Sequence, residues 1–239
     1  MAEEKSCGPS AVAKYHDYKK ETYYSGNTNR TRYRYVIEIT GTGRVDSIET
    51  RNSPDCRHDI IVHEGITELA DGCFSKYYVD VIKLPKSLKK IGNKCFASTD
   101  ITSIELHEGL EEIGEYNFPN SLTSVNIPDS LKFFPITNIG SSKVSTLKLT
   151  ENHVNYALVN GVLYNKEKTE ILYCPRNKKQ SFTIPNGVKR IGDYCFNCVQ
   201  EMPVVIIPPT VTEIGKYALA HLNLKRLTIP NTVTSVGEG

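Results

Sequence analysis

Residues 101–118 read ITSIELHEGLEEIGEYNF, and most of the chain repeats the spacing of apolar residues in this stretch. The recurring positions in this copy are Ile101, Ile104, Leu106, Leu110, Ile113-Gly114 and Phe118. The position held here by Leu106 recurs at Val62, Leu84, Ile127, Leu149, Ile184, Ile207 and Ile229. Successive copies are separated by 21 to 23 residues, with one exception of 35 residues. Self-similarity at this period predicts a solenoid of stacked coils.

Each copy begins with a short alternating stretch, in which Ile104 and Leu106 face one way and their neighbours the other, as in a β-strand. The stretch that follows, residues 109–118, is short and contains glycine, so we predict a turn and a brief extended piece at Ile113-Gly114. Phe118 then closes a return corner. One coil buries too few apolar residues to fold alone, so stability requires coils that share a core and a strand ladder.

The skeleton L-x-x-I-x-[IL]-P-x-x-[VL]-x-x-I-G-x-x-[AC]-F resembles the BspA-like subclass of leucine-rich repeats over about residues 60–237. The resemblance implies a mostly β, curved, right-handed solenoid with a parallel sheet on its concave side. We therefore predict an array of about eight repeats of 22–23 residues over 58–239.

Two copies depart from the pattern. The fourth has Phe133-Phe134-Pro135 where others have Ile-Gly, and Ile139 replaces the corner phenylalanine, which predicts a distorted coil. The fifth is followed by 13 extra residues that contain Asn160-Gly161 between apolar segments. Asn-Gly favours a type I′ hairpin turn, so the sequence predicts a three-stranded antiparallel meander over residues 156–173.

Residues 1–57 are predicted as an N-terminal cap, because an open solenoid end exposes both core and strand edge. Residues 1–9 are expected to be disordered and residues 10–24 to form a short amphipathic helix. The alternating strand 32–40 is expected to turn at Gly41-Thr42-Gly43 into a second strand, 44–48, of a hairpin. Gly41-Thr42-Gly43 also resembles the start of a dinucleotide-binding loop. Asp46 stands where that loop needs its third glycine, so the hairpin is favoured.

Composition excludes several classes of protein. The 239-residue chain has 29 basic and 27 acidic residues and a net charge of +2, which argues against general nucleic-acid or membrane-surface binding. The basic–aromatic strip around Arg32 is diluted by nearby acidic residues. No apolar run is long enough to span a membrane, and no secretory leader is visible. The seven cysteines are predicted to be reduced.

No catalytic, cofactor-binding or metal-binding residues are predicted, and we expect that this chain is not an enzyme. The repeated pairs His63-Glu64 and His107-Glu108 lack a second histidine at the spacing of a zinc helix. The pair Cys195-x-x-Cys198 lacks a second such pair or a partner histidine, so a buried structural role is favoured.

The outward side chains of the repeat strands form the candidate protein-binding face. Eight strands at ~4.8 Å spacing would make a ribbon roughly 35–40 Å long, suited to a protein or an extended peptide. The apolar residues near its C-terminal end mark a contact site or are covered by a neighbouring loop. The candidate residues are Lys83, Glu105, Asn126, Lys148, Thr183, Val204, Ile206 and Arg226.

The leading hypothesis is a non-enzymatic scaffold for protein–protein interaction. The family resemblance implies a cell-surface adhesin that binds host or matrix protein. The alternative is a cytoplasmic adaptor that uses the same face, which the missing leader and the odd number of cysteines favour. The last strand, residues 226–230, is expected to expose its edge, which predicts self-association there or a longer array.

Overall fold

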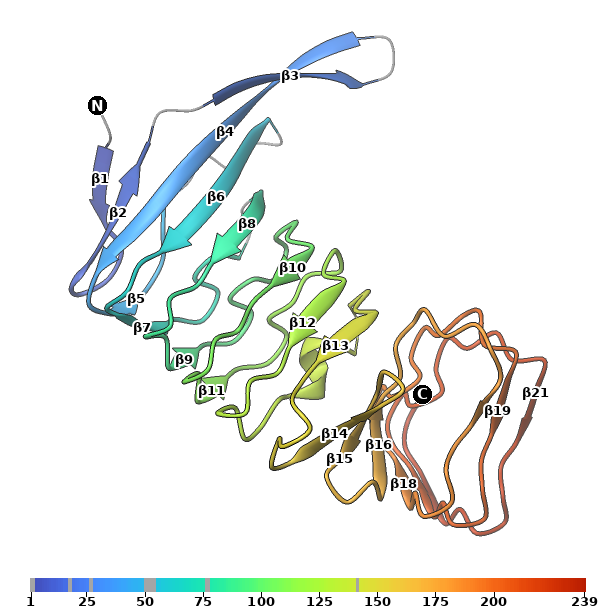
Figure 1. Cartoon of the computed structure of the whole chain (residues 1–239). Coiled ribbons are helices and arrows are strands. Elements are labelled where there is room, and N and C mark those ends of the chain that lie inside the picture. The colour runs from blue at the N-terminus through green and yellow to red at the C-terminus, as the bar shows by residue number, and fades with distance from the viewer. Residues whose placement is uncertain (1–2, 17–18, 26–27, 50–54, 76–77, 141) are drawn as a thin grey trace. The chain divides into compact units, whose positions relative to one another are not determined.

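The computed structural model describes residues 3–16, 19–25, 28–49, 55–75, 78–140 and 142–239 (Figure 1). The chain is mostly β and divides into two compact units, residues 1–122 and 123–239. In both units, parallel strands from successive repeats pair side by side, as a solenoid of stacked coils requires.

The first unit contains eleven described strands. They are β1 (Glu3–Ser6), β2 (Ala11–Tyr15), β3 (Lys19–Ser25), β4 (Thr28–Gly41), β5 (Gly43–Val45), β6 (Cys56–Val62), β7 (Ile66–Leu69), β8 (Val79–Lys83), β9 (Lys90–Ile91), β10 (Ser103–Ile104) and β11 (Glu112–Ile113). Strands β4, β6 and β8 pair in parallel, and Figure 1 shows them side by side. A second parallel sheet joins β5, β7, β9 and β11, one return strand from each coil.

The return sheet explains the Ile-Gly pair of the repeat. Leu69, Ile91 and Ile113 are paired in register and buried. The N–H of Gly114 donates to the carbonyl of Ile91 at 2.8 Å, and the N–H of Gly92 donates in the same way to Leu69. A Cβ on Gly114 would lie 2.7 Å from the backbone nitrogen of Asn93. Only glycine therefore allows the coils to approach this closely.

The corner phenylalanines form a second interior ladder in the first unit. The rings of Phe74, Phe96 and Phe118 stack with centroids 6.1 and 6.5 Å apart. Each ring is buried. Equivalent residues of successive repeats thus lie on top of one another, as the repeat predicts.

The predictions for the N-terminal segment were largely wrong. The predicted helix over 10–24 is β2 followed by β3, and residues 3–6, predicted to be disordered, form β1. Strand β2 pairs antiparallel with β4 and buries Ala11 and Ala13 while Val12 faces outward. The pairing of β2 with β4 therefore overrides the helical pattern of the sequence.

The predicted hairpin of 32–40 and 44–48 is also wrong. Strand β4 pairs with β6, whereas β5 pairs with β7, so the two strands belong to different sheets. Val45 is fully buried in line with Leu69. The segment thus forms one more coil before the first predicted repeat, with β1 and β2 added to its outer edge. The division of the chain at residue 57 remains a prediction.

The second unit consists of eleven strands and one 3₁₀ turn among the residues described. They are β12 (Ser124–Asn126), η1 (Ile136–Asn138), β13 (Thr146–Lys148), β14 (Tyr156–Val159), β15 (Val162–Asn165), β16 (Glu170–Tyr173), β17 (Phe182–Thr183), β18 (Arg190–Ile191), β19 (Val204–Ile206), β20 (Glu213–Ile214), β21 (Arg226–Thr228) and β22 (Ser235–Val236). Strands β17, β19 and β21 form one parallel sheet. Strands β16, β18, β20 and β22 form the parallel part of another.

The insertion forms the predicted meander. Strands β14 and β15 are antiparallel, as are β15 and β16. In the turn between β14 and β15, Asn160 and Gly161 have φ of 50° and 78°, as a type I′ turn requires. Strand β16 then pairs in parallel with β18, so the last strand of the insertion serves as the return strand of the fifth coil.

The fourth coil is distorted in the predicted region. Phe134 is buried, Phe133 is 70% exposed, and η1 follows where a return strand would continue. Pro135 has no N–H to donate to a ladder. The buried Ile139 takes the place of the corner phenylalanine.

Candidate protein-binding face

We use the term strand face for the outward side chains of the first strand of each coil. In the first unit it includes Asp59 and Ile61 on β6, which pair in register with Val81 and Lys83 on β8. Lys83 is exposed and Val81 is 38% exposed. Glu105 follows β10 and is also exposed, with its carboxylate 4.0 Å from His107 Nδ1. The inward neighbours Ile82 and Leu84 are buried, which fixes the outward direction of Lys83.

An ion-pair network lies near the first residues of β6 and β8. Arg34 Nη2 lies 2.9 Å from a carboxylate oxygen of Asp80, and Arg34 Nη1 lies 3.4 Å from Asp59. Arg57 also binds Asp80, through Nη2 and through Nε at 3.1 Å, and its Nη1 donates to Asp100 at 2.6 Å. Four successive coils, those of β4, β6 and β8 and the one that begins at Ile101, are thereby linked by side chains. Arg34, part of the basic–aromatic strip in the sequence, is engaged by these carboxylates.

The electrostatics of the network follow from partial burial and charge. Burial alone would raise the pKa of Asp80, but the hydrogen bonds and charges of Arg57 and then Arg34 hold that pKa below its ordinary value. The hydrogen bond to Asp80 raises the pKa of Arg57. The network contains two cations and three carboxylates, so it is close to neutral and is better suited to ordering the strand face than to holding an anion.

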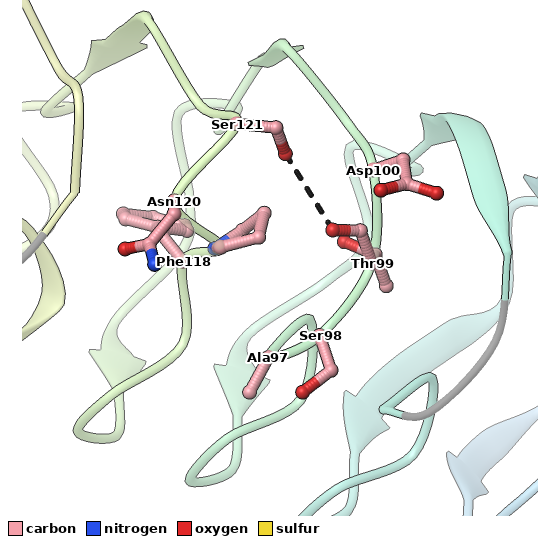
Figure 2. Close-up of a pocket in the computed structure, with 8 residues that line it drawn as sticks. Ala97, Ser98, Thr99, Asp100, Phe118, Asn120 and Ser121 are labelled. Carbon is pink, nitrogen blue, oxygen red and sulfur yellow. Dashed lines mark hydrogen bonds between the residues drawn. The ribbon is translucent and has the colours of Figure 1, made fainter.

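A shallow pocket lies beside the network, within the first unit. Figure 2 shows its walls, residues 97–100 from one corner and 118–121 from the next. Its volume is about 370 Å³. Ser121 Oγ donates to the carbonyl of Ile101 at 2.8 Å and lies 3.5 Å from that of Thr99, the bond drawn in Figure 2. Asp100, which lines the pocket, is the residue that accepts from Arg57.

A second polar group on this unit surrounds Glu38 of β4. Its Oε2 lies 2.9 Å from His16 Nε2, and its Oε1 lies 3.7 Å from His63 Nε2. The hydrogen bond with His16 lowers the pKa of Glu38. His63 directly follows β6 and is exposed. Among the residues that the structure covers, no cluster of histidine, cysteine, aspartate and glutamate could hold a metal ion.

In the second unit, the predicted face residues lie in register pairs. Asn126 on β12 faces Lys148 on β13. Thr183 on β17 faces Ile206 on β19, and Val204 on β19 faces Arg226 on β21. Lys148, Thr183 and Arg226 are exposed, and Asn126 and Val204 are half-buried. Ile206 is 51% exposed, so no neighbouring loop covers it.

The predicted single ribbon of eight strands is wrong. Within the described part of the second unit, no ladder joins β13 to β17, and the pairs form two separate sheets. The insertion after β13 lengthens the step between these copies to 35 residues. The missing ladder thus coincides with the one long step between copies, which the sequence spacing already shows.

The sequence matches the BspA type leucine rich repeat region in six copies, over residues 52–160 and 172–239. The chain belongs to this family. This BspA-type repeat protein is similar in fold to a leucine-rich repeat protein from Eubacterium ventriosum. That likeness has a TM-score of 0.73 and 24% identity, and it covers 99% of this chain and 68% of the other.

A second similar structure is the pneumococcal vaccine antigen PcpA, with a TM-score of 0.56 and 17% identity over 99% of this chain and 78% of the antigen. No curated protein matches the sequence. The BspA-type repeats make this chain a repeat-protein scaffold for protein interaction, a fold typical of non-enzymatic proteins. None of the described helices is long and apolar enough to cross a membrane.

Proposed function

We infer that this chain is the protein-binding part of a cell-surface adhesin, and that its strand face contacts a host or matrix protein. The proposed contact residues are Lys83 and Glu105 in the first unit and Asn126, Lys148, Thr183, Val204, Ile206 and Arg226 in the second. The observation that carries the proposal is the exposure of Ile206 on β19, the central strand of its sheet.

The surroundings of Ile206 favour a protein over a small molecule. It lies between Thr183 and Thr228 in register, on a strand that also places Val204 beside Arg226. An apolar centre with a hydroxyl and cationic rim is typical of protein interfaces. Burial of a half-exposed isoleucine by a partner contributes roughly 1 kcal/mol or more to affinity.

The surface location rests on the family and on the nature of one similar protein. PcpA is a vaccine antigen, which agrees with a family that presents its repeats outside the cell. The second candidate is a cytoplasmic adaptor that uses the same face. Seven free thiols, six of them buried, favour it, because disulfides form in secreted proteins and are rare in cytosolic ones.

Two experiments test these alternatives. Surface biotinylation of intact source cells should label the protein if it is an adhesin, whereas label found only after lysis would favour the adaptor. A pull-down from matrix or host extract should lose its partner when Ile206→Lys is used. Val236→Lys, which changes an exposed valine on the return sheet, is the matched control. Equal capture of the partner by both variants would contradict the proposal that the strand face binds it.

A further inference from the structure

Strand β14 is the outermost strand of its sheet, and among the strands that the structure describes none pairs with its outer edge (Figure 1). Lys166 N–H donates to the carbonyl of Asn155, so residues 155 and 166 form a hydrogen-bonded pair. Hydrogen-bonded and non-bonded pairs alternate along antiparallel strands. The backbone groups of Leu158, opposite Leu163, therefore point away from β15. In the described part of the chain, no hydrogen bond uses them.

A cavity of about 540 Å³ lies against the same strand. Ala157, Leu158 and Val159 form one wall, and residues 149–151, which follow β13, form another. Lys166 and Lys168 also line it, with Glu151 as the one carboxylate. Lys166 Nζ donates to the Glu151 carbonyl at 3.0 Å. The ammonium groups outnumber the carboxylate, so an occupant with negative charge is favoured.

Exposed apolar side chains stand at the neighbouring corner. Asn155 Nδ2 donates to the Lys132 carbonyl at 2.6 Å, which ties these two segments together. The residues next to them, Val154 and Phe133, are 59% and 70% exposed. The distortion of the fourth coil thus leaves a free strand edge, a cavity and two apolar side chains in one region of the second unit.

We propose that β14 is a second docking site, which takes an extended acidic peptide segment of a protein partner as an added strand. The peptide backbone bonds to Leu158 N–H and C=O, a carboxylate meets Lys168, and an apolar side chain contacts Phe133 or Val154. This mode of recognition gains affinity from main-chain bonds and specificity from side chains beside the edge. The site is separate from the strand face and uses none of its residues.

The sharpest test is Leu158→Pro. Proline removes the outward N–H, which the fold does not use, and its φ suits an edge strand. Leu158→Ala keeps the N–H and is the matched control. Random peptides of about ten residues displayed on phage should be selected on the wild-type protein and counter-selected on Leu158→Pro. We expect acidic, alternating peptides that bind Leu158→Ala within a few-fold of wild type and Leu158→Pro about tenfold more weakly or worse.

Two further readouts define the site. A selected peptide should slow hydrogen exchange at the Leu158 amide, and Lys168→Glu should weaken binding, whereas Lys216→Glu elsewhere on the unit should not. Circular dichroism and the melting temperature check that each variant is folded. The proposal is overturned if no selected peptide distinguishes Leu158→Pro from Leu158→Ala. It is also overturned if protection at Leu158 grows with protein concentration without peptide, since a second copy would then occupy the edge.

Discussion

The hydroxyl of Tyr156 accepts a hydrogen bond from the backbone N–H of Phe134 at 2.8 Å, across the point where the return ladder is interrupted. In regular coils that N–H position is served by the backbone of a neighbouring strand. Here a side chain from the insertion serves it, and Asn155 binds Lys132 beside it. The insertion is thereby joined to the fourth coil by side chains in place of a ladder.

Tyr156→Phe should therefore destabilise the protein. The change removes the acceptor of a buried N–H while it keeps the ring, and we expect a loss of about 1–3 kcal/mol in the free energy of unfolding. Urea denaturation measures it. Tyr164→Phe is the control, because Tyr164 is buried but no hydrogen bond of its hydroxyl is found in the described structure. Equal losses in both variants would contradict the bridging role.

Gly114→Ala should disturb the stacking of coils. The added Cβ would lie 2.7 Å from Asn93 N, so the coils must separate locally, at a cost of about 1–3 kcal/mol. The adjacent change Glu115→Ala leaves the backbone contacts in place and should alter stability by less than about 0.5 kcal/mol. Thermal unfolding of both variants measures the difference. A Gly114→Ala protein that is as stable as the wild type would argue against close approach of the coils.

The ion network predicts acid sensitivity of the first unit. Asp80 has a lowered pKa in the folded protein, so its contribution to stability is complete above the ordinary aspartate value of about 4. That contribution is lost as the pH falls through the lower folded value. Asp80→Asn should thus lower stability at neutral pH and weaken its decline on acidification. Denaturation between neutral pH and strong acid tests this.

The control for the network is Glu112→Gln, which removes an exposed ion pair with Lys90. Exposed pairs contribute about 0–1 kcal/mol, so this variant should follow the wild-type pH profile. A profile for Asp80→Asn that is parallel to wild type would show that the network contributes no acid dependence.

The cysteines should differ in reactivity under native conditions. Burial raises the pKa of Cys7 to about 11 and that of Cys174 to about 12, which suppresses the reactive thiolate. Cys198 is partly exposed. Brief treatment with a maleimide should add one label, at Cys198, by mass spectrometry, and seven after denaturation. Rapid native labelling of Cys73 or Cys95 would contradict their buried placement.

The repeat sequence predicted the regular coils because their apolar spacing has few physical solutions. The Ile-Gly pair, the corner phenylalanines and the Asn-Gly hairpin each carry a local signal with one structural meaning. The N-terminal strands lack such a signal. Ala11 and Ala13 are suited to helix and strand alike, and the choice depends on pairing with β4, more than twenty residues later in the chain.

The candidate face was predictable only in part, for a similar reason. Alternation along each strand gave the outward residues, and the structure places Thr183 beside Ile206 as register requires. The ion network was missed because Arg57, Asp80 and Asp100 lie in different coils at positions that the repeat does not fix. The free edge of β14 was not predicted, because it depends on how the irregular fourth coil continues into η1.

The fold and the strand face both depend on the stacking of equivalent residues from successive coils. Methyl–methyl nuclear Overhauser effects in protein with labelled isoleucine and leucine methyl groups test it. Ile91 should show strong effects to both Leu69 and Ile113, its in-register neighbours on the return sheet. Effects from Ile91 to neither residue would show that the coils do not stack in this register and would contradict the fold and the strand face together.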